Sequence, residues 1–112
     1  MTIIKRSRED LTKADLYKMV TDKTIKKMST VTGQNLDIED YVIYEEVNNS
    51  TGEIMRILSV KTKTGAYATN SPTFIESFEK IIECFGADFK TIGVLEDTSR
   101  AGRKYIQCTY IA

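Results

Sequence analysis

The sequence contains no histidine, and histidine is the side chain most often used as a general base and as a metal ligand. Its two cysteines, Cys84 and Cys108, form no Cys-x-x-Cys pair, so a zinc site would need carboxylates to complete it. A Walker loop and a Gly-x-Ser-x-Gly motif are missing as well. We therefore expect no enzymatic activity and no cofactor. We expect both cysteines to be unpaired and to be buried as small hydrophobic side chains.

Long apolar segments are also absent. No run of about 18 apolar residues is present that could span a membrane. The first residues, MTIIKRSRED, include basic side chains but lack the apolar segment of a secretory signal. These absences predict a cytoplasmic protein that does not contact a membrane.

Neither sign of charge is in excess, because 16 basic and 16 acidic side chains balance over 112 residues. A typical non-specific DNA-coating protein is strongly basic. The distribution is uneven, however. Residues 1–30 have eight basic and four acidic side chains, a net of +4; residues 34–53 have a net of −6; and residues 54–75 have a net of +3. This uneven distribution of charge is compatible with one basic face on the protein and equally with an ordinary solvated surface.

From Tyr41 onward the chain alternates between strand-like and helix-like segments. Runs rich in β-branched and aromatic residues between turn signals predict strands, and apolar residues at helical spacing predict one helix. The predicted strands are Tyr41–Val47, Ile54–Lys63, Ala66–Thr69, Phe89–Glu96 and Lys104–Ile111, and the predicted helix is Pro72–Phe85. Three strands, a helix and two strands is the order of the OB-fold, a five-stranded, partly open Greek-key barrel.

The first 35 residues are predicted to form a helical arm packed on this barrel, which then spans residues 36–112 of a single domain. They are too few to bury a core of their own. Ser7 and Thr12 are candidate helix caps. Ala14–Thr21 predicts a short amphipathic helix, and a second helical turn is expected at Lys23–Met28, whose lysines form a basic cluster. The first barrel strand could begin as early as Leu36.

An exposed aromatic ring beside lysines is typical of sites for single-stranded nucleic acid, because bases stack on the ring while ammonium groups contact phosphates. Tyr67 on the third predicted strand is expected beside Lys61 and Lys63; alternatively, it closes the barrel with its hydroxyl at the rim. The basic loop before the last strand would flank the ligand. The predicted nucleic-acid-binding residues are Lys61, Lys63, Tyr67, Arg100, Arg103, Lys104, Tyr105 and Arg56. The strand neighbours of Arg56, Ile54 and Leu58, are expected to be buried.

Four segments point to a family. They are the TIIKRSRE start, ATNSPTF from Ala68 to Phe74, FKTI from Phe89 to Ile92, and AGRKYIQC from Ala101 to Cys108. Together they resemble small single-stranded DNA-binding proteins of phages and integrated mobile elements of Gram-positive bacteria. The resemblance implies an OB-fold that binds single-stranded DNA during replication or recombination in the cytoplasm of a bacterial host.

A second class of function stays open. The acidic stretch from Asp37 to Glu46 would repel phosphate and suit a basic partner, which favours a protein-binding OB-fold module such as a phage factor that engages a host protein. The sequence also leaves the assembly open. A homodimer or larger homo-oligomer is compatible with it, as is contact with replication or recombination proteins.

Overall fold

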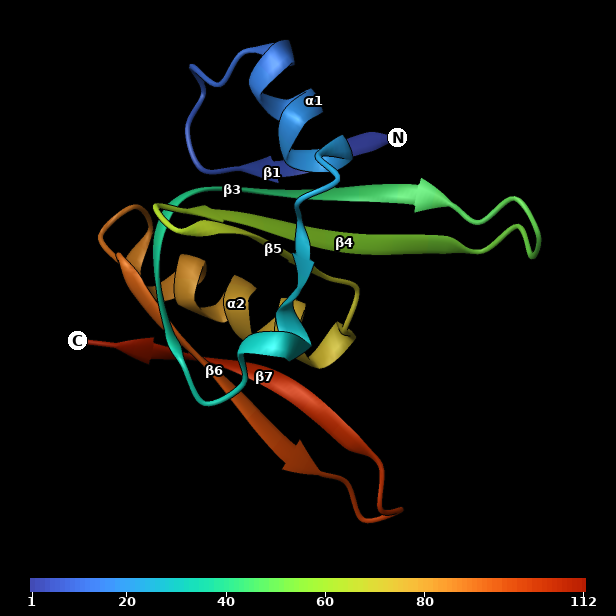
Figure 1. Cartoon of the computed structure of the whole chain (residues 1–112), viewed down its shortest axis with the longest axis vertical. Helices are drawn as coiled ribbons and strands as arrows, with labels where there is room; N and C mark the ends of the chain where they lie inside the picture. Colours follow the sequence, from blue (N-terminus) through green and yellow to red (C-terminus); the bar gives the residue numbers. More distant parts are fainter.

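The computed structural model describes all 112 residues, which form a mainly β structure with two α-helices (Figure 1). The strands are β1 (Thr2–Arg6), β2 (Lys26–Lys27), β3 (Asn35–Val47), β4 (Ile54–Thr62), β5 (Gly65–Thr69), β6 (Thr91–Thr98) and β7 (Lys104–Ile111). The α-helices are α1 (Lys13–Thr21) and α2 (Pro72–Phe85), and a 3₁₀ helix, η1, spans Met28–Val31. None of these helices has the length and apolar character needed to cross a membrane.

The predicted order of three strands, one helix and two strands is confirmed by β3, β4, β5, α2, β6 and β7. The helix α2 has the predicted bounds. The strand β3 is longer than Tyr41–Val47, because its first residues, 35–37, pair with β6. Lys63, Phe89 and Lys90 were predicted to lie in strands but fall just outside β4 and β6, and Lys63 is in the turn that leads to β5.

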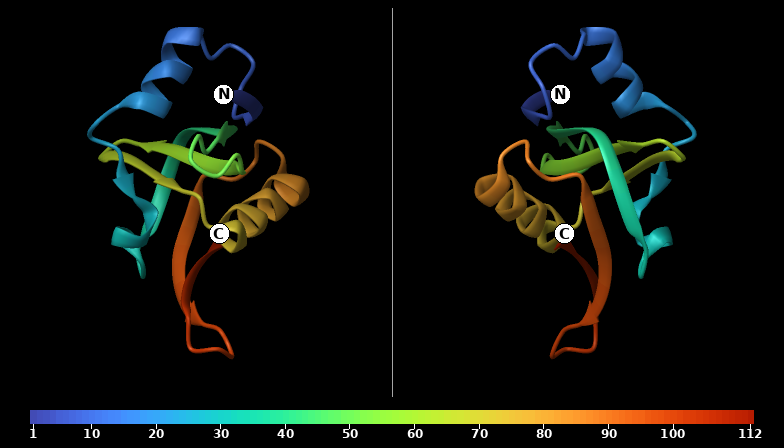
Figure 2. Two further views of the ribbon diagram at one scale, coloured as in Figure 1. Left: turned by 90° about the vertical axis from the view of Figure 1, so that its right-hand side faces the viewer. Right: turned by 90° about the vertical axis from the view of Figure 1, so that its left-hand side faces the viewer.

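The strands form one sheet in the order β2-β5-β4-β3-β6-β7, and β1 pairs with β3 on the side opposite β4. All pairings are antiparallel except the short parallel contact between β2 and β5. Because β3 pairs with β6 at its start and with β4 beyond it, the sheet bends along β3. It curls into a half barrel from which the β6–β7 hairpin extends away from the β4 layer (Figure 2).

The main core lies inside this curl, where α2 packs against the sheet. Phe74 and Phe78 of α2 are fully buried in one cluster with Leu58 and Val60 of β4, and the burial of Leu58 was predicted from the sequence. Ser71 caps α2 by accepting a hydrogen bond from the backbone N–H of Phe74, and Pro72 occupies the first turn.

The helix α2 also covers the edge of β7. The hydroxyl of Thr73 donates to the carbonyl of Ile106 at 2.7 Å, and the hydroxyl of Ser77 accepts from the backbone N–H of Cys108 at 2.8 Å. These bonds satisfy backbone groups that no neighbouring strand pairs. Thr73 is an alternative candidate cap by sequence, because Glu76 follows three residues later, and these bonds explain why it does not cap the helix.

Two expectations about α2 need correction at its C-terminal end. The helical spacing of Phe74, Phe78, Ile81, Ile82 and Phe85 predicts that Phe85 faces the barrel, but it is 37% exposed and stacks on Tyr110, whereas Ile75 is buried. Both cysteines are free, as expected, but only Cys108 is buried. Cys84 is exposed because it lies on the side of α2 that faces solvent.

The N-terminal arm is only partly helical, which corrects the sequence prediction. Its first residues form β1 because they find a pairing partner in β3, far along the chain. The helical turn predicted at Lys23–Met28 is absent; Lys26 and Lys27 form β2 beside β5, and η1 follows. Short strands of this kind depend on partners that local sequence patterns do not reveal.

A second, smaller core lies on the outer face of the sheet, under α1. Leu16 and Met19 of α1 pack there against Val42 and Tyr44 of β3. Ser59 also points to this face, but it is buried and donates a hydrogen bond to the carbonyl of Met19 at 2.7 Å. Burial on both sides explains why β3 has apolar residues on both of its faces.

Candidate nucleic-acid interface

A groove of about 450 Å³ lies between α1 and the turn from β4 to β5. Residues of the N-terminal arm form one wall, and the β4–β5 turn forms the other with Asp40 of β3. Both Lys61 and Lys63, predicted from the sequence to bind nucleic acid, line this groove. Arg8 and Lys18 line it from the opposite wall, and neither was predicted.

The three lysines of the groove, Lys18, Lys61 and Lys63, are exposed, and none of them forms an ion pair. Their ammonium groups therefore retain unused hydrogen-bond donors. Lys61 lies opposite Asp40 in the register of β3 and β4, and its charge helps to lower the pKa of Asp40. The groove thus contains three unpaired cationic donors from two separate parts of the chain.

The groove also contains three acids, Asp15, Asp22 and Asp40, against four basic residues, which leaves a net charge of +1. Asp15 accepts from the backbone N–H of Thr12 at 3.0 Å and completes a capping box at the start of α1. Asp22 accepts from the backbone N–H and the hydroxyl of Thr24 at 2.8 and 2.7 Å. The backbone hydrogen bonds, with those of the hydroxyls, lower the pKa of both carboxyls.

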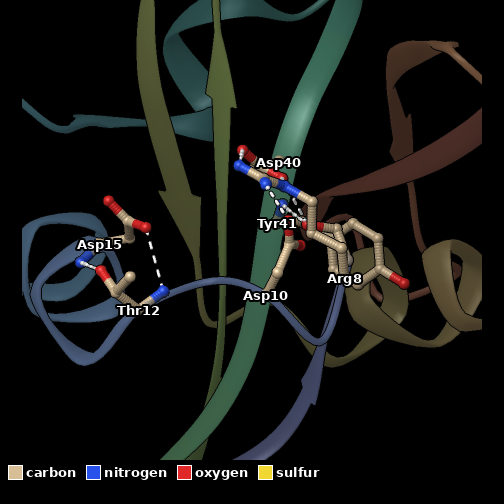
Figure 3. Close-up of polar contacts among 7 residues, drawn as sticks. Arg8, Asp10, Thr12, Asp15, Asp40 and Tyr41 are labelled. Atoms are coloured by element: carbon tan, nitrogen blue, oxygen red, sulfur yellow. Dashed lines mark hydrogen bonds and ion pairs between the residues drawn. The ribbon is translucent and has the colours of Figure 1, made fainter.

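The third acid, Asp40, anchors the arm to the barrel (Figure 3). It is buried and accepts from the hydroxyl of Ser7 at 2.8 Å and from Nε and Nη2 of Arg8 at 2.9 and 3.2 Å. Burial by itself raises the pKa of Asp40, but the hydrogen bonds from Arg8 and Ser7 outweigh it, so the pKa is lowered. The same contact raises the pKa of Arg8. We refer to Ser7, Arg8 and Asp40 as the latch.

Tyr67 does not lie beside the groove lysines. It pairs in register with the buried Val60, is half-buried and packs against the main core. Lys61 is the next residue after Val60, so its side chain leaves the opposite face of the sheet. The expected juxtaposition of Tyr67 with Lys61 and Lys63 is therefore wrong, and the alternative position, in which this tyrosine closes the barrel, agrees with its packing.

Arg56 is held by two carboxylates. Its guanidinium lies 3.5 Å from Glu45 and 3.2 Å from Glu79, which bridges β4 to α2. Of its strand neighbours, Leu58 is buried as expected, whereas Ile54 is 67% exposed. With its charge already compensated, Arg56 is a poor phosphate ligand.

The remaining predicted residues gather at another end of the molecule. Arg100 and Arg103 lie in the β6–β7 turn, and Lys104 and Tyr105 begin β7. Figure 1 places this turn at the far tip of the β6–β7 hairpin, well separated from the β4–β5 turn. Lys104 approaches Glu96 at 3.9 Å, and Tyr105 is half-buried. Of the predicted residues, the structure thus brings only Lys61 and Lys63 together in the groove and places the four residues of the hairpin tip far from them.

The comparisons with known proteins identify no relative: no protein-family model, no curated protein and no solved structure matches this chain. No three aspartate, glutamate or cysteine side chains gather in a way that could hold a metal ion.

Proposed function

We propose that the protein binds single-stranded DNA in the groove between α1 and the β4–β5 turn. The observation that carries this proposal is the convergence of Lys18, Lys61 and Lys63, all exposed and unpaired, on one groove whose acids are engaged by other groups. Ammonium groups of this kind neutralise phosphates without reading sequence. Binding is expected to be independent of sequence and strongly dependent on salt.

We further propose that β3 to β7 with α2 form an OB-fold, to which β1, α1, β2 and η1 are additions. Four pairings support this assignment, namely β3–β4, β4–β5, β3–β6 and β6–β7. They give the Greek-key connectivity of a barrel that stays open between β5 and β7, with the helix between the third and fourth strands. The fold commonly binds oligonucleotides, which agrees with the proposed ligand.

The proposed setting is DNA replication or recombination of a phage or mobile element in a bacterial cytoplasm. The resemblance of the four sequence segments supports this setting. The two free cysteines are compatible with it, because thiols persist in a reducing compartment.

The test is the binding of fluorescently labelled oligo-dT across a salt series. Each phosphate contact contributes about 0.7 to the slope of log affinity against log salt on single strands, so Lys61→Ala/Lys63→Ala should reduce the slope by about 1.4. The matched control is Arg100→Ala/Arg103→Ala, which removes the same charge from the far hairpin. If the wild type shows no salt-dependent binding at low ionic strength, the function is wrong. If the control lowers the slope and the lysine variant does not, the site lies on the hairpin.

A second candidate function, contact with a partner protein, is favoured by one observation. Val47 and Ile54 face each other across the β3–β4 hairpin and are 59% and 67% exposed. The acidic stretch gives less support than the sequence implied, because Asp40 and Glu45 are paired with Arg8 and Arg56. Failure of the wild type to bind oligo-dT would favour this second function.

A further inference from the structure

Base stacking needs an aromatic ring with an open face. The two tyrosines predicted for this role, Tyr67 and Tyr105, are both half-buried. Three aromatic side chains of the chain are exposed: Tyr17 at 67%, Tyr110 at 38% and Phe85 at 37%. Phe85 and Tyr110 stack on each other with centroids 4.0 Å apart and an interplanar angle of 7°, so each ring covers one face of the other. Tyr17 is the exposed ring that pairs with no other aromatic side chain.

Tyr17 is in the middle of α1, and its surroundings suit a nucleic acid. Its neighbours on the helix surface, three and four residues away, are Lys13, Ala14, Val20 and Thr21, so one is basic and none is acidic. Ala14 and Thr21 are small and exposed, which leaves room over the ring. None of these four nearest neighbours on the helix surface therefore brings a carboxylate to the ring.

The next residue, Lys18, lines the groove. Successive residues of an α-helix lie about 100° apart around its axis, so Lys18 is directed to the groove while Tyr17 lies further around the outer surface. The base and the phosphate of one nucleotide are joined through its sugar. Neighbouring positions on the helix can therefore hold both parts of a single nucleotide.

The helix that presents Tyr17 is firmly held. Leu16 and Met19 are buried in the second core, the capping box of Thr12 fixes the first turn, and the latch ties the preceding residues to β3. A ring presented by a fixed helix loses little conformational freedom on binding. The backbone that carries Tyr17 is therefore held in place before any ligand binds.

We propose that Tyr17 is a base-stacking residue of the single-stranded DNA site, with Lys18 as its neighbouring phosphate contact. This inference rests on the proposed function and extends it, because it makes the N-terminal arm one half of the binding surface. The strand crosses the outer surface of α1 and continues into the groove toward Lys61 and Lys63.

The test separates stacking from charge. Tyr17→Ala should weaken oligo-dT binding about 5- to 150-fold, corresponding to about 1–3 kcal/mol per stacked base, and should leave the salt slope unchanged. Tyr17→Phe, which keeps the ring, should bind like the wild type. Lys18→Ala should instead reduce the salt slope by about 0.7.

An abasic oligonucleotide of the same length sharpens the comparison, because it keeps the phosphates and removes the stacking partner. On that ligand, Tyr17→Ala and the wild type should bind equally. If Tyr17→Ala binds oligo-dT like the wild type while Lys61→Ala/Lys63→Ala is impaired, Tyr17 does not stack and the DNA-binding function stands. If the wild type itself does not bind oligo-dT at low salt, both the inference and the function are overturned.

Discussion

The latch should contribute measurably to stability, and Arg8→Ala tests it. Asp40 lines the groove but has only 10% of its side chain exposed, and Arg8 supplies two of its three side-chain hydrogen bonds. Removing Arg8 leaves a buried carboxylate with one remaining side-chain donor, the hydroxyl of Ser7. The loss of stability arises mainly from the uncompensated charge of the Asp40 carboxylate and less from the lost attraction between Arg8 and Asp40.

Breaking a fully buried ion pair costs about 3–5 kcal/mol, but the side chain of Arg8 is 52% exposed, so water screens the contact and the cost is smaller. Hydrogen bonds to charged groups contribute about 1.5–3 kcal/mol. We therefore expect Arg8→Ala to lower the free energy of unfolding at neutral pH by more than the loss of an ordinary surface ion pair does. The matched control is Arg6→Ala, whose partner Glu9 is 93% exposed; it should cost less than about 0.5 kcal/mol.

Urea unfolding followed by circular dichroism measures both changes as shifts of the midpoint. The effect should also depend on pH. Because the pKa of folded Asp40 is lowered, its stabilisation is present above the unfolded value of about 3.9 and is lost as the pH falls through the folded value. The difference between wild type and Arg8→Ala should thus shrink below about pH 4. A loss no larger than that of Arg6→Ala, or one that stays constant down to acidic pH, would refute the reasoning.

Two further predictions concern the cysteines and β6. Native protein should react with a thiol reagent at Cys84 alone, because burial raises the pKa of Cys108 to about 12. Denaturation should make the thiol of Cys108 reactive as well. Two fast-reacting thiols in the native state would contradict this prediction. Gly93→Ala should cost about 1–3 kcal/mol of unfolding free energy, since a Cβ would lie 2.9 Å from Cγ2 of Thr109. The double variant with Thr109→Ser should recover part of that loss in the same urea assay, and an unchanged midpoint for the single variant would argue against the close packing.

Local sequence signals were sufficient to predict a structural element when its caps and its apolar pattern lie within the element itself. The helix α2 has a capping serine, a proline in its first turn and apolar residues at helical spacing, so its bounds follow from residues 71–86 alone. The order of strands around it follows from turn signals in the same way. Lys61 and Lys63 could be expected at the surface because they lie at a short turn between two predictable strands.

Only the tertiary structure decided the features that depend on pairing between distant segments, namely the formation of β1 and the orientation of β3. Thr2, Ile3 and Ile4 are β-branched, but the segment Thr2–Arg6 is short and shows no clear alternation of apolar and polar residues. It forms β1 because β3 offers a free edge. The apolar residues on both faces of β3 left its orientation undecided until α1 and α2 were placed on opposite sides of it.

The composition of the groove was likewise settled only by the fold. A one-residue step between Val60 and Lys61 puts Tyr67 and Lys61 on opposite faces of the sheet, although they are close in sequence. Lys18 enters the groove because the latch and the second core place α1 on the outer face of β3 and β4. The sequence by itself determined the helix α2, the order of β3 to β7 along the chain and the unpaired cysteines, since each follows from local patterns or overall composition. Which charges share a surface was decided by long-range contacts, because the packing of α1 and the curl of the sheet bring together residues that are distant in the chain.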